Sequence, residues 1–268
     1  KDGRGVKFEP SVPGERLDIE GSAAAVERAL FGLEAEDETK TETPIELPMA
    51  EILPAITTVA SNPYGITEII GIGETNFRGS PKNRRINIAI GAKSLDGLLV
   101  MGGDEFSLLK ALGEINAAAG YKQELVIKED KTVPEFGGGL CQIGSTTFRA
   151  VLASGLPVTA RQNHSYRVPY YERDGDGSYI GPGKDATIYD PAPDFKFMND
   201  TGHAVLIKTK ITGDRLTFTF WGAKDGRTAA QTVARVYNVV PPPPKKLIET
   251  PDLPPGKTKC TESPHAGS

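Results

Sequence analysis

Hydrophobic and polar residues alternate most regularly in the second half of the chain. In the segments 204–208 and 216–220, β-branched and aromatic residues recur at every second position, which is the period of a half-buried strand. The Gly213-Asp214 pair between them predicts a turn that joins two antiparallel strands. Shorter apolar runs predict strands at 45–50, 51–58, 125–127, 158–161, 186–189 and 233–240, and runs that fit either a strand or a short helix lie at 87–90 and 97–100.

Helical patterns are fewer. The clearest helix is predicted to begin at Cys141 and to end before Gly155, because glycine favours a helix end. Another helix is predicted over 22–31, with Ser22 as its N-cap, and a short one over 63–70. Together these elements predict an α+β fold that is mainly antiparallel sheet with a few helices.

Four stretches are predicted along the chain. Residues 1–58 are expected to be the end of a module whose first part is absent, since so small a helix-and-strand fragment can hardly bury its own core. A connector over 59–74 leads into a central domain over 75–240. Residues 241–268 are expected to be a proline-rich linker and the start of a further module.

Charge and composition narrow the function classes. The 268 residues include 31 Lys and Arg and 35 Asp and Glu, a formal net charge of −4. A general nucleic-acid-binding surface is not expected, because it would need a basic excess. No apolar run approaches the roughly 20 residues that cross a bilayer, and no signal peptide is expected in this stretch.

The segment 137–147, Gly-Gly-Gly-Leu-Cys-Gln-Ile-Gly-Ser-Thr-Thr, carries the most chemical information. Its glycines allow backbone conformations closed to other residues and let a substrate approach closely. They lead into the helix predicted at Cys141, and unpaired N–H groups at a helix N-terminus lower the pKa of a thiol there. Cys141 is therefore a candidate nucleophile for acyl transfer. The same N–H groups and the Gln142 side chain are candidate donors to an oxyanion.

A nucleophilic cysteine needs a base, and His164 is the candidate. Histidine titrates in the range in which it can take a proton from Cys141 and later return it to a leaving amine. A carboxylate can orient such an imidazole. Asp185 is the candidate for this role, with Asp190 and Asp194 as alternatives from the same region.

Further side chains are candidates for substrate binding. An arginine can hold a substrate carboxylate by paired hydrogen bonds, and a tyrosine can line a groove. An arginine is also an ordinary surface charge, and a tyrosine is an ordinary packing residue of strands. The substrate-binding candidates are Arg84, Gly138, Gly139, Gln142, Thr146, Arg161, Ser165 and Tyr170.

Other interpretations of these residues stay open at this point. Cys141 fits a small buried hydrophobic residue equally well, and the glycines before it fit a phosphate site, although no Lys follows at the spacing of a nucleotide-binding loop. Cys141, His164 and Asp185 would be a permitted zinc set, but the close ligand pair that usually marks zinc is missing. A disulfide between Cys141 and Cys260 is a further hypothesis. No metal or cofactor is expected.

The same motifs carry a family resemblance. The chain resembles the VanW domain over about residues 75–222. The resemblance is carried by the segment 137–147, Arg161 with His164-Ser165, Asn83-Arg84, and Gly183 with Asp185-Ala-Thr187. The order and spacing of GGGxCQ and RxxHS make the resemblance specific. One departure is the stretch 102–105, where the family more often has Pro-Gly before the acidic residue. Residues 1–58 resemble the end of a peptidoglycan-binding module that often precedes VanW domains, and 246–268 resemble the opening of a surface module.

The resemblance implies a function in the bacterial cell wall. Some family members are reported to be cysteine L,D-transpeptidases, which crosslink peptidoglycan between the third residues of two stem peptides. On this sequence, Cys141 would be the nucleophile and His164 the base. The resemblance implies peptidoglycan stem peptides as partners, no nucleic acid, and a location at the extracellular face of the membrane or in the cell wall, with a membrane anchor outside this stretch. The alternative is a non-catalytic peptidoglycan-binding module linked to glycopeptide resistance.

Overall fold

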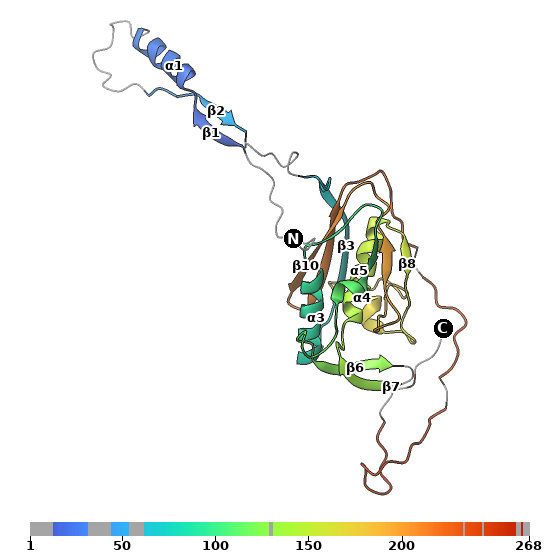
Figure 1. Ribbon diagram of the computed structural model, residues 1–268. Coiled ribbons are helices and arrows are strands. Elements are labelled where there is room, and N and C mark those ends of the chain that lie inside the picture. Colours follow the sequence, from blue (N-terminus) through green and yellow to red (C-terminus); the bar gives the residue numbers. More distant parts are fainter. Residues whose placement is uncertain are drawn as a thin grey trace. The chain divides into compact units, whose positions relative to one another are not determined.

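Figure 1 shows the computed structural model of the chain, which describes residues 13–31, 44–53, 62–128, 131–232, 234–242, 244–260 and 264. The chain forms two compact units, Lys7–Pro63 and a larger unit that contains Tyr64–Ser268. Among the described residues, the smaller unit contains one pair of strands and one helix, and the larger unit holds the other elements.

In the smaller unit, β1 (Gly14–Leu17) pairs with β2 (Met49–Ile52) in an antiparallel ladder, and α1 (Ile19–Phe31) follows β1. The strands predicted over 45–50 and 51–58 are wrong in their bounds, because β2 crosses the boundary between them. Of the second predicted strand, residues 54–58 lie outside the described part of the chain.

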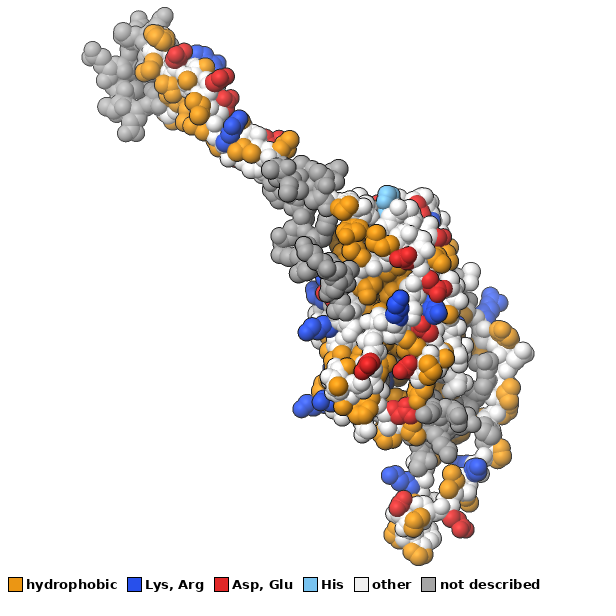
Figure 2. All heavy atoms as spheres, in the orientation of Figure 1, with side chains coloured by type: hydrophobic (Ala, Val, Ile, Leu, Met, Phe, Trp, Pro, Cys, Tyr) orange, Lys and Arg blue, Asp and Glu red, His pale blue; other side chains and the backbone are white. Residues whose placement is uncertain are grey.

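The helix α1 begins before the predicted N-cap. The Asp18 carboxylate accepts a hydrogen bond of 3.0 Å from the backbone N–H of Gly21, so Asp18 satisfies one of the free donors at the helix start. Ser22 lies inside the helix instead. Ile19 and Phe31 are 76% and 88% exposed, and Figure 2 shows hydrophobic side chains on the surface of this unit. A helix and two short strands therefore leave much of their apolar surface uncovered.

The main sheet of the larger unit has four strands, all antiparallel to their neighbours, in the order β3-β11-β10-β4. They are β3 (Glu68–Asn76), β11 (Arg215–Gly222), β10 (Val205–Thr212) and β4 (Leu98–Val100). The predicted strand pair at 204–208 and 216–220 is confirmed, and it is joined at Gly213, whose φ is +61°. The helix predicted over 63–70 is wrong, because β3 begins there. Its buried positions are small residues, Gly71, Gly73 and Thr75, so the strand shows no apolar alternation.

Two smaller sheets and the remaining helices complete this unit (Figure 1). They are the sheet β5-β9-β8 (Glu105–Ser107, Lys196–Met198 and Val158–Ala160), the hairpin β6-β7 (Gln123–Lys128 and Lys131–Phe136), α3 (Lys82–Leu95), α4 (Leu108–Leu112), α5 (Cys141–Ser154) and the short 3-10 helix η1 (Pro169–Glu172). The strands predicted near 125–127 and 158–161 are confirmed as β6 and β8. The ambiguous run at 87–90 is part of α3, and the run at 97–100 forms β4.

Two predicted strands do not form as such. In 186–189, Thr187 makes a single bridge to Gln162, and the other residues of the segment belong to no helix or strand. Among the described residues of 233–240, no run forms a strand. Both segments have the apolar composition of strands, but their described residues form no strand ladder, so local pattern alone could not decide their structure.

The helix predicted at Cys141 is confirmed as α5, which packs across β3 and β11. At Gly73 an added Cβ would collide with the carbonyl oxygen of Thr146 and the backbone N of Ala150. At Gly71 it would collide with the Ser154 hydroxyl. These two glycines therefore allow the helix backbone to lie directly on the strand. The contact fixes the position of α5, and with it that of Cys141.

Gly73→Ala is expected to lower the free energy of unfolding by about 1–3 kcal/mol, because the added methyl group overpacks the contact between β3 and α5. Denaturant unfolding measures the change. Gly202→Ala is the control, since a Cβ at Gly202 meets no atom within 4 Å, and it is expected to unfold like wild type. Equal midpoints for the two variants would contradict this account of the close approach.

The predicted fold class, α+β with mainly antiparallel sheet, is confirmed. The core of the larger unit is aromatic: Phe195, Phe197, Phe218 and Phe220 have no exposed surface. Within the part of the chain that the structure describes, no helix has the length and apolarity to cross a bilayer.

Candidate functional site

The chain reaches Cys141 through a tight turn. Gly137 and Gly139 have φ angles of +81° and +113°, which favour glycine. A Cβ at Gly139 would also lie 2.7 Å from Cγ of Arg84, so this glycine lets the arginine lie against the turn. The helix α5 then begins at Cys141, and its N-cap residue, Leu140, makes no capping side-chain hydrogen bond. No capping side chain therefore competes with an anion at this helix start.

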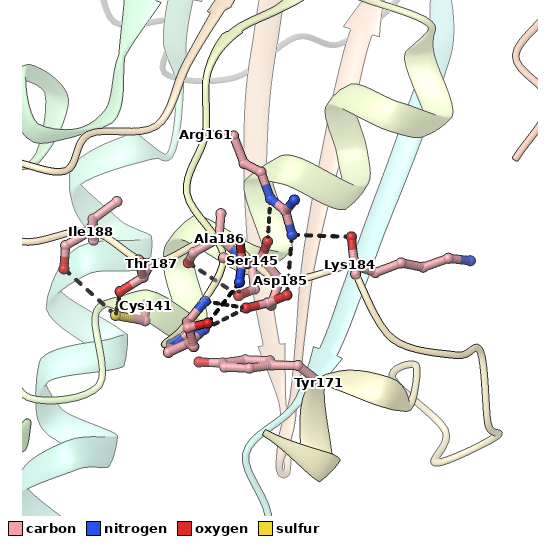
Figure 3. Close-up of polar contacts among 12 residues, drawn as sticks. Cys141, Ser145, Arg161, Tyr171, Lys184, Asp185, Ala186, Thr187 and Ile188 are labelled. Carbon is pink, nitrogen blue, oxygen red and sulfur yellow. Dashed lines mark hydrogen bonds and ion pairs between the residues drawn. The ribbon is translucent and has the colours of Figure 1, made fainter. Parts of the chain in front are cut away.

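Cys141 lines an open cleft of about 410 Å³ and is itself partly exposed. Its sulfur lies 3.4 Å from Oγ1 of Thr187 and 3.6 Å from the carbonyl oxygen of Ile188 (Figure 3). The His164 imidazole lines the same cleft and acts directly on the ionisation of the thiol. The sulfur is thus accessible from the cleft and surrounded by polar groups.

The imidazole of His164 is held by Asp185. Nδ1 lies 2.6 Å from Oδ2 of Asp185, and the backbone N–H of His164 donates to the same oxygen at 2.9 Å. The ring stacks on Tyr171, with centroids 5.1 Å apart. Of the other two carboxylates, Asp190 lines the cleft and Asp194 binds the start of α4. Asp185 is therefore the carboxylate that orients the imidazole.

The three groups change one another's ionisation. For Cys141, burial alone would raise the pKa, but the hydrogen bond and charge of His164, helped by Thr187 and Ile188, lower it to about 7. For His164, burial alone would lower the pKa, but Asp185 and Cys141 raise it to about 9. For Asp185, the hydrogen bonds of His164 and the charge of Arg161 outweigh burial and lower the pKa. Between about pH 7 and 9 the pair is therefore a thiolate beside an imidazolium.

The Asp185 segment is tied to the rest of the fold on two sides. Arg161 donates from Nε to the carbonyl oxygen of Asp185 (2.8 Å) and from Nη2 to its carboxylate (3.2 Å). The guanidinium in turn lies 4.9 Å from the ring centroid of Phe148 in α5. On the other side, Ser145 of α5 accepts a hydrogen bond of 3.0 Å from the backbone N–H of Ala186. Arg161 is thus a positioning residue for Asp185.

A buried arginine on α5 holds the backbone around the imidazole. Arg149 donates to four backbone carbonyl oxygens, those of Glu74, Tyr171, Arg173 and Lys184. Its burial lowers its pKa to about 10, so it remains a cation at neutral pH. One side chain therefore joins β3, the segment that carries Tyr171 and the segment that leads into Asp185.

The cleft beside Cys141 contains charges of both signs. Arg84 of α3 donates from Nη2 to the Tyr170 hydroxyl (3.2 Å). Glu135 of the β6-β7 hairpin accepts a hydrogen bond of 2.7 Å from the Tyr189 hydroxyl. A second cavity, of about 500 Å³, shares His164 as a lining residue. His164 therefore lies between two hollows of the surface, although its side chain is largely buried.

The structure separates the predicted substrate-binding residues into three places. Arg84, Gly139 and Tyr170 line the cleft beside Cys141, and Arg161 and Ser165 line the second cavity. The remaining three, Gly138, Gln142 and Thr146, are buried in the fold.

The burial of Gln142 has a geometric cause. Gln142 and Thr146 are one helical turn apart and share the face of α5 that packs on β3. The Gln142 amide donates to the carbonyl oxygen of Asn76 (3.3 Å), and the Thr146 hydroxyl lies 2.6 Å from that of Thr75. Both side chains point away from the cleft, so the amide of Gln142 does not reach an oxyanion at Cys141. Gly138 is likewise a packing residue, since a Cβ there would lie 2.6 Å from the carbonyl oxygen of Glu124.

Comparison with known proteins identifies the family of the region that contains these residues. The family model described as VanW like protein matches residues 83–221, which is more than half of the chain and contains Cys141, His164 and Asp185. This chain belongs to the VanW family. The resemblance predicted over about 75–222 is thus confirmed.

Two curated relatives match part of the chain. The chain is 33% identical over 157 residues to the Uncharacterized protein YoaR of Bacillus subtilis (strain 168), covering 59% of this chain and 49% of that protein. It is 31% identical over 120 residues to the Vancomycin B-type resistance protein VanW of Enterococcus faecalis (strain ATCC 700802 / V583), covering 45% of this chain and 42% of that protein. The chain thus spans about half the length of the curated relatives it matches. No solved structure matches it.

Three contacts in the VanW domain give their residues roles that sequence reasoning did not assign. Tyr171 stacks on His164, Thr187 contacts the Cys141 sulfur, and Arg149 holds the surrounding backbone. A signal was available only for Arg149, which is an arginine in an otherwise apolar stretch of the predicted helix. The roles of Tyr171 and Thr187 arise from contacts between distant segments, which the sequence does not display.

The structure of the VanW domain argues against two alternative interpretations of Cys141. Neither cysteine forms a disulfide, and Cys260 is exposed, so the disulfide hypothesis is wrong. Among the residues that the structure describes, no three His, Cys, Asp or Glu side chains form a group suited to a metal ion. Cys141, His164 and Asp185 form a chain of contacts instead, with the imidazole between the other two.

Asp185→Asn is expected to lower the pKa of His164 from about 9 to about 7 or below, because the imidazolium loses the carboxylate that accepts its Nδ1 proton. NMR titration of the imidazole measures the change. Since a lowered pKa means that the proton is lost at lower pH, the upper limit of the ion pair moves down by the same amount. The matched control is Asp194→Asn, which removes a carboxylate from the start of α4. A His164 pKa that is equal in both variants would contradict the assigned contact.

Proposed function

We propose that this VanW domain is a cysteine acyltransferase that acts as an L,D-transpeptidase on peptidoglycan stem peptides. The observation that carries the proposal is the linked arrangement of three groups at an open cleft. Asp185 holds the imidazole of His164, and His164 lowers the pKa of Cys141 to about 7. A thiolate that is accessible, oriented and present at neutral pH is what nucleophilic attack on an acyl group requires.

In the acylation step, the Cys141 thiolate attacks the carbonyl carbon of the third stem residue. A bond forms between sulfur and carbon, and the carbonyl oxygen becomes an oxyanion. Candidate donors to it are the backbone N–H of Cys141 at the start of α5 and the Thr187 hydroxyl, whereas the N–H of Gln142 already donates to the carbonyl oxygen of Gly139. His164, already an imidazolium, gives its proton to the nitrogen of the terminal D-Ala. The carbon–nitrogen bond then breaks, and a thioester remains on Cys141.

In the transfer step, the side-chain amine of a second stem attacks the thioester. The neutral His164 left by the first step takes the proton of the attacking amine. The carbon–sulfur bond breaks, an amide joins the two stems, and the thiolate and imidazolium are restored. Every proton that His164 gives in the first step is thus recovered in the second.

The family and the state of Cys141 favour this proposal over a non-catalytic binding module. A binding module would be expected to have a sealed cysteine, whereas Cys141 is partly exposed and lines the cleft. The name of the enterococcal relative refers to vancomycin resistance, which fits a substrate in the cell wall. The partners proposed here are peptidoglycan stem peptides. The proposed location is the extracellular face of the membrane or the cell wall, where such stems are crosslinked.

Intact-mass analysis after incubation with a stem tetrapeptide tests the proposal. We expect free D-Ala in solution and a tripeptide acyl group on the protein. An added acceptor amine is expected to remove this group and form a crosslinked product. A protein that binds the tetrapeptide but neither releases D-Ala nor gains mass would favour the binding module.

A further inference from the structure

Arg84 and Tyr170 meet beside the nucleophile, although they come from separate parts of the fold. Arg84 lies in the first turn of α3, and Tyr170 lies in η1. Nη2 of Arg84 donates to the Tyr170 hydroxyl at 3.2 Å, and the guanidinium carbon lies 5.7 Å from the ring centroid. Both side chains line the cleft that contains Cys141. A cation is therefore held at the edge of the reaction site.

Arg84 differs from neighbouring arginines in its partners. Arg85 pairs with Asp214 at 2.6 Å, Arg161 with Asp185 at 3.2 Å, and Arg167 with Glu172 at 2.6 Å. Among the described residues, Arg84 pairs with no carboxylate and uses one of its five N–H donors on Tyr170. The guanidinium thus retains the paired donors that bind a carboxylate in bidentate fashion.

The position and the charge of Arg84 are both fixed. Its side-chain stem lies against Gly139, where a Cβ would come within 2.7 Å of Cγ. Burial alone would lower the pKa of Arg84, but its interactions with Tyr171, Tyr170 and Cys141 outweigh burial and raise it. The guanidinium is therefore charged throughout the pH range in which the Cys141 thiolate exists. Because its side chain is already held in place, little conformational entropy is lost when an anion binds.

We infer that Arg84, held by Tyr170, binds the free α-carboxylate of the residue that leaves during acylation. The inference rests on the proposed function, because the leaving residue is defined by attack of Cys141. The leaving nitrogen must approach His164, and an α-carboxylate lies only two bonds beyond that nitrogen. A cation in the same cleft is within reach of it. The site then selects acyl donors that end one residue after the scissile bond with a free carboxylate.

A small anionic reagent tests the subsite without any peptide substrate. Iodoacetate and iodoacetamide both alkylate a thiolate, with formation of the sulfur–carbon bond and loss of iodide, but only iodoacetate carries a carboxylate. The ratio of their rates at Cys141 cancels changes in the thiolate fraction. Peptide mass spectrometry reads Cys141 separately from the exposed Cys260, which supplies an internal reference in the same sample.

We expect wild type to favour iodoacetate at Cys141, relative to Cys260, and Arg84→Gln to lose about tenfold or more of that ratio. Arg84→Lys is expected to retain part of it, because the charge remains but the paired donors are lost. Tyr170→Phe keeps the guanidinium of Arg84 but removes the hydroxyl that holds it, so this variant is expected to lose a smaller part of the iodoacetate preference. Arg85→Gln is the matched control and should behave like wild type. A ratio that is the same in Arg84→Gln and wild type overturns the inference.

A second arm identifies the source of the bound carboxylate. Wild type is compared on a stem tetrapeptide and on the same peptide with a C-terminal amide. We expect the amide to lose at least about tenfold in kcat/KM, and Arg84→Gln to process both peptides at the low rate of the amide. Equal rates on both peptides in wild type overturn the assignment to the leaving residue. Absence of acylation with every peptide, together with an Arg84-dependent iodoacetate ratio, would instead refute the proposed transpeptidase function and leave the anion site standing.

Discussion

Cys141→Ser is expected to abolish acylation, with a loss of at least about 10³-fold in D-Ala release. The replacement keeps the shape of the side chain, so the fold should be unchanged. The Cys141 thiol has a pKa of about 7 and is largely ionised at neutral pH, whereas a serine hydroxyl stays protonated there and offers no anionic nucleophile. A site that ionises a thiol in this way therefore does not ionise a serine hydroxyl. Release of D-Ala and the intact mass of the protein measure the loss.

The second cysteine provides the matched control for this variant. Cys260 is exposed and forms no disulfide, and Cys260→Ser is expected to retain the activity and the acyl adduct of wild type. Thermal unfolding of both variants checks that the loss in Cys141→Ser is chemical. Substantial D-Ala release by Cys141→Ser would show that another residue is the nucleophile and would remove the basis of the proposed mechanism.

His164→Gln is expected to slow acylation by about 10²–10⁴-fold at neutral pH. Two effects add in the same direction. The thiol loses the interaction that lowers its pKa to about 7, so its pKa rises to about the usual 8.5 or above, because burial is then less opposed, and less thiolate is present. The leaving amine also loses its proton donor. Rates of D-Ala release, and of alkylation by iodoacetamide, separate the two effects because alkylation needs only the thiolate.

The exposed His203 supplies the control for this second variant. His203→Gln is expected to match wild type in both assays. Raising the pH should restore alkylation of His164→Gln, since the thiol still ionises at higher pH, but should not restore D-Ala release. A variant that acylates within a few-fold of wild type would mean that His164 neither ionises Cys141 nor protonates the leaving group.

The features that the sequence could predict are those that depend on neighbours along the chain. The start of α5 at Cys141 follows from a glycine turn and a local helical pattern. The hairpin of β10 and β11 likewise follows from alternation around one turn. His164 and Asp185 could also be identified as candidates from the sequence, but the 2.6 Å contact between their side chains depends on the fold. Three candidate carboxylates could be listed from the sequence, but choosing among them required the tertiary structure.

The features that the sequence could not predict depend on packing between distant segments. β3 could not be predicted because its buried positions are Gly71, Gly73 and Thr75, which do not form a hydrophobic pattern. These small residues allow α5 to pack closely on the strand. Gln142 follows Cys141 directly, so its side chain points to a different face of the helix. Which face meets the sheet and which meets the cleft is decided by β3, some 70 residues earlier in the chain.

The central claim is that His164 ionises Cys141 at neutral pH. The ultraviolet absorbance of the thiolate, followed against pH in a Cys260→Ser background, tests it most directly. We predict a midpoint near pH 7 that moves up by about one pH unit or more in His164→Gln. A midpoint near the usual 8.5 of a free thiol, unchanged by His164→Gln, would contradict the account.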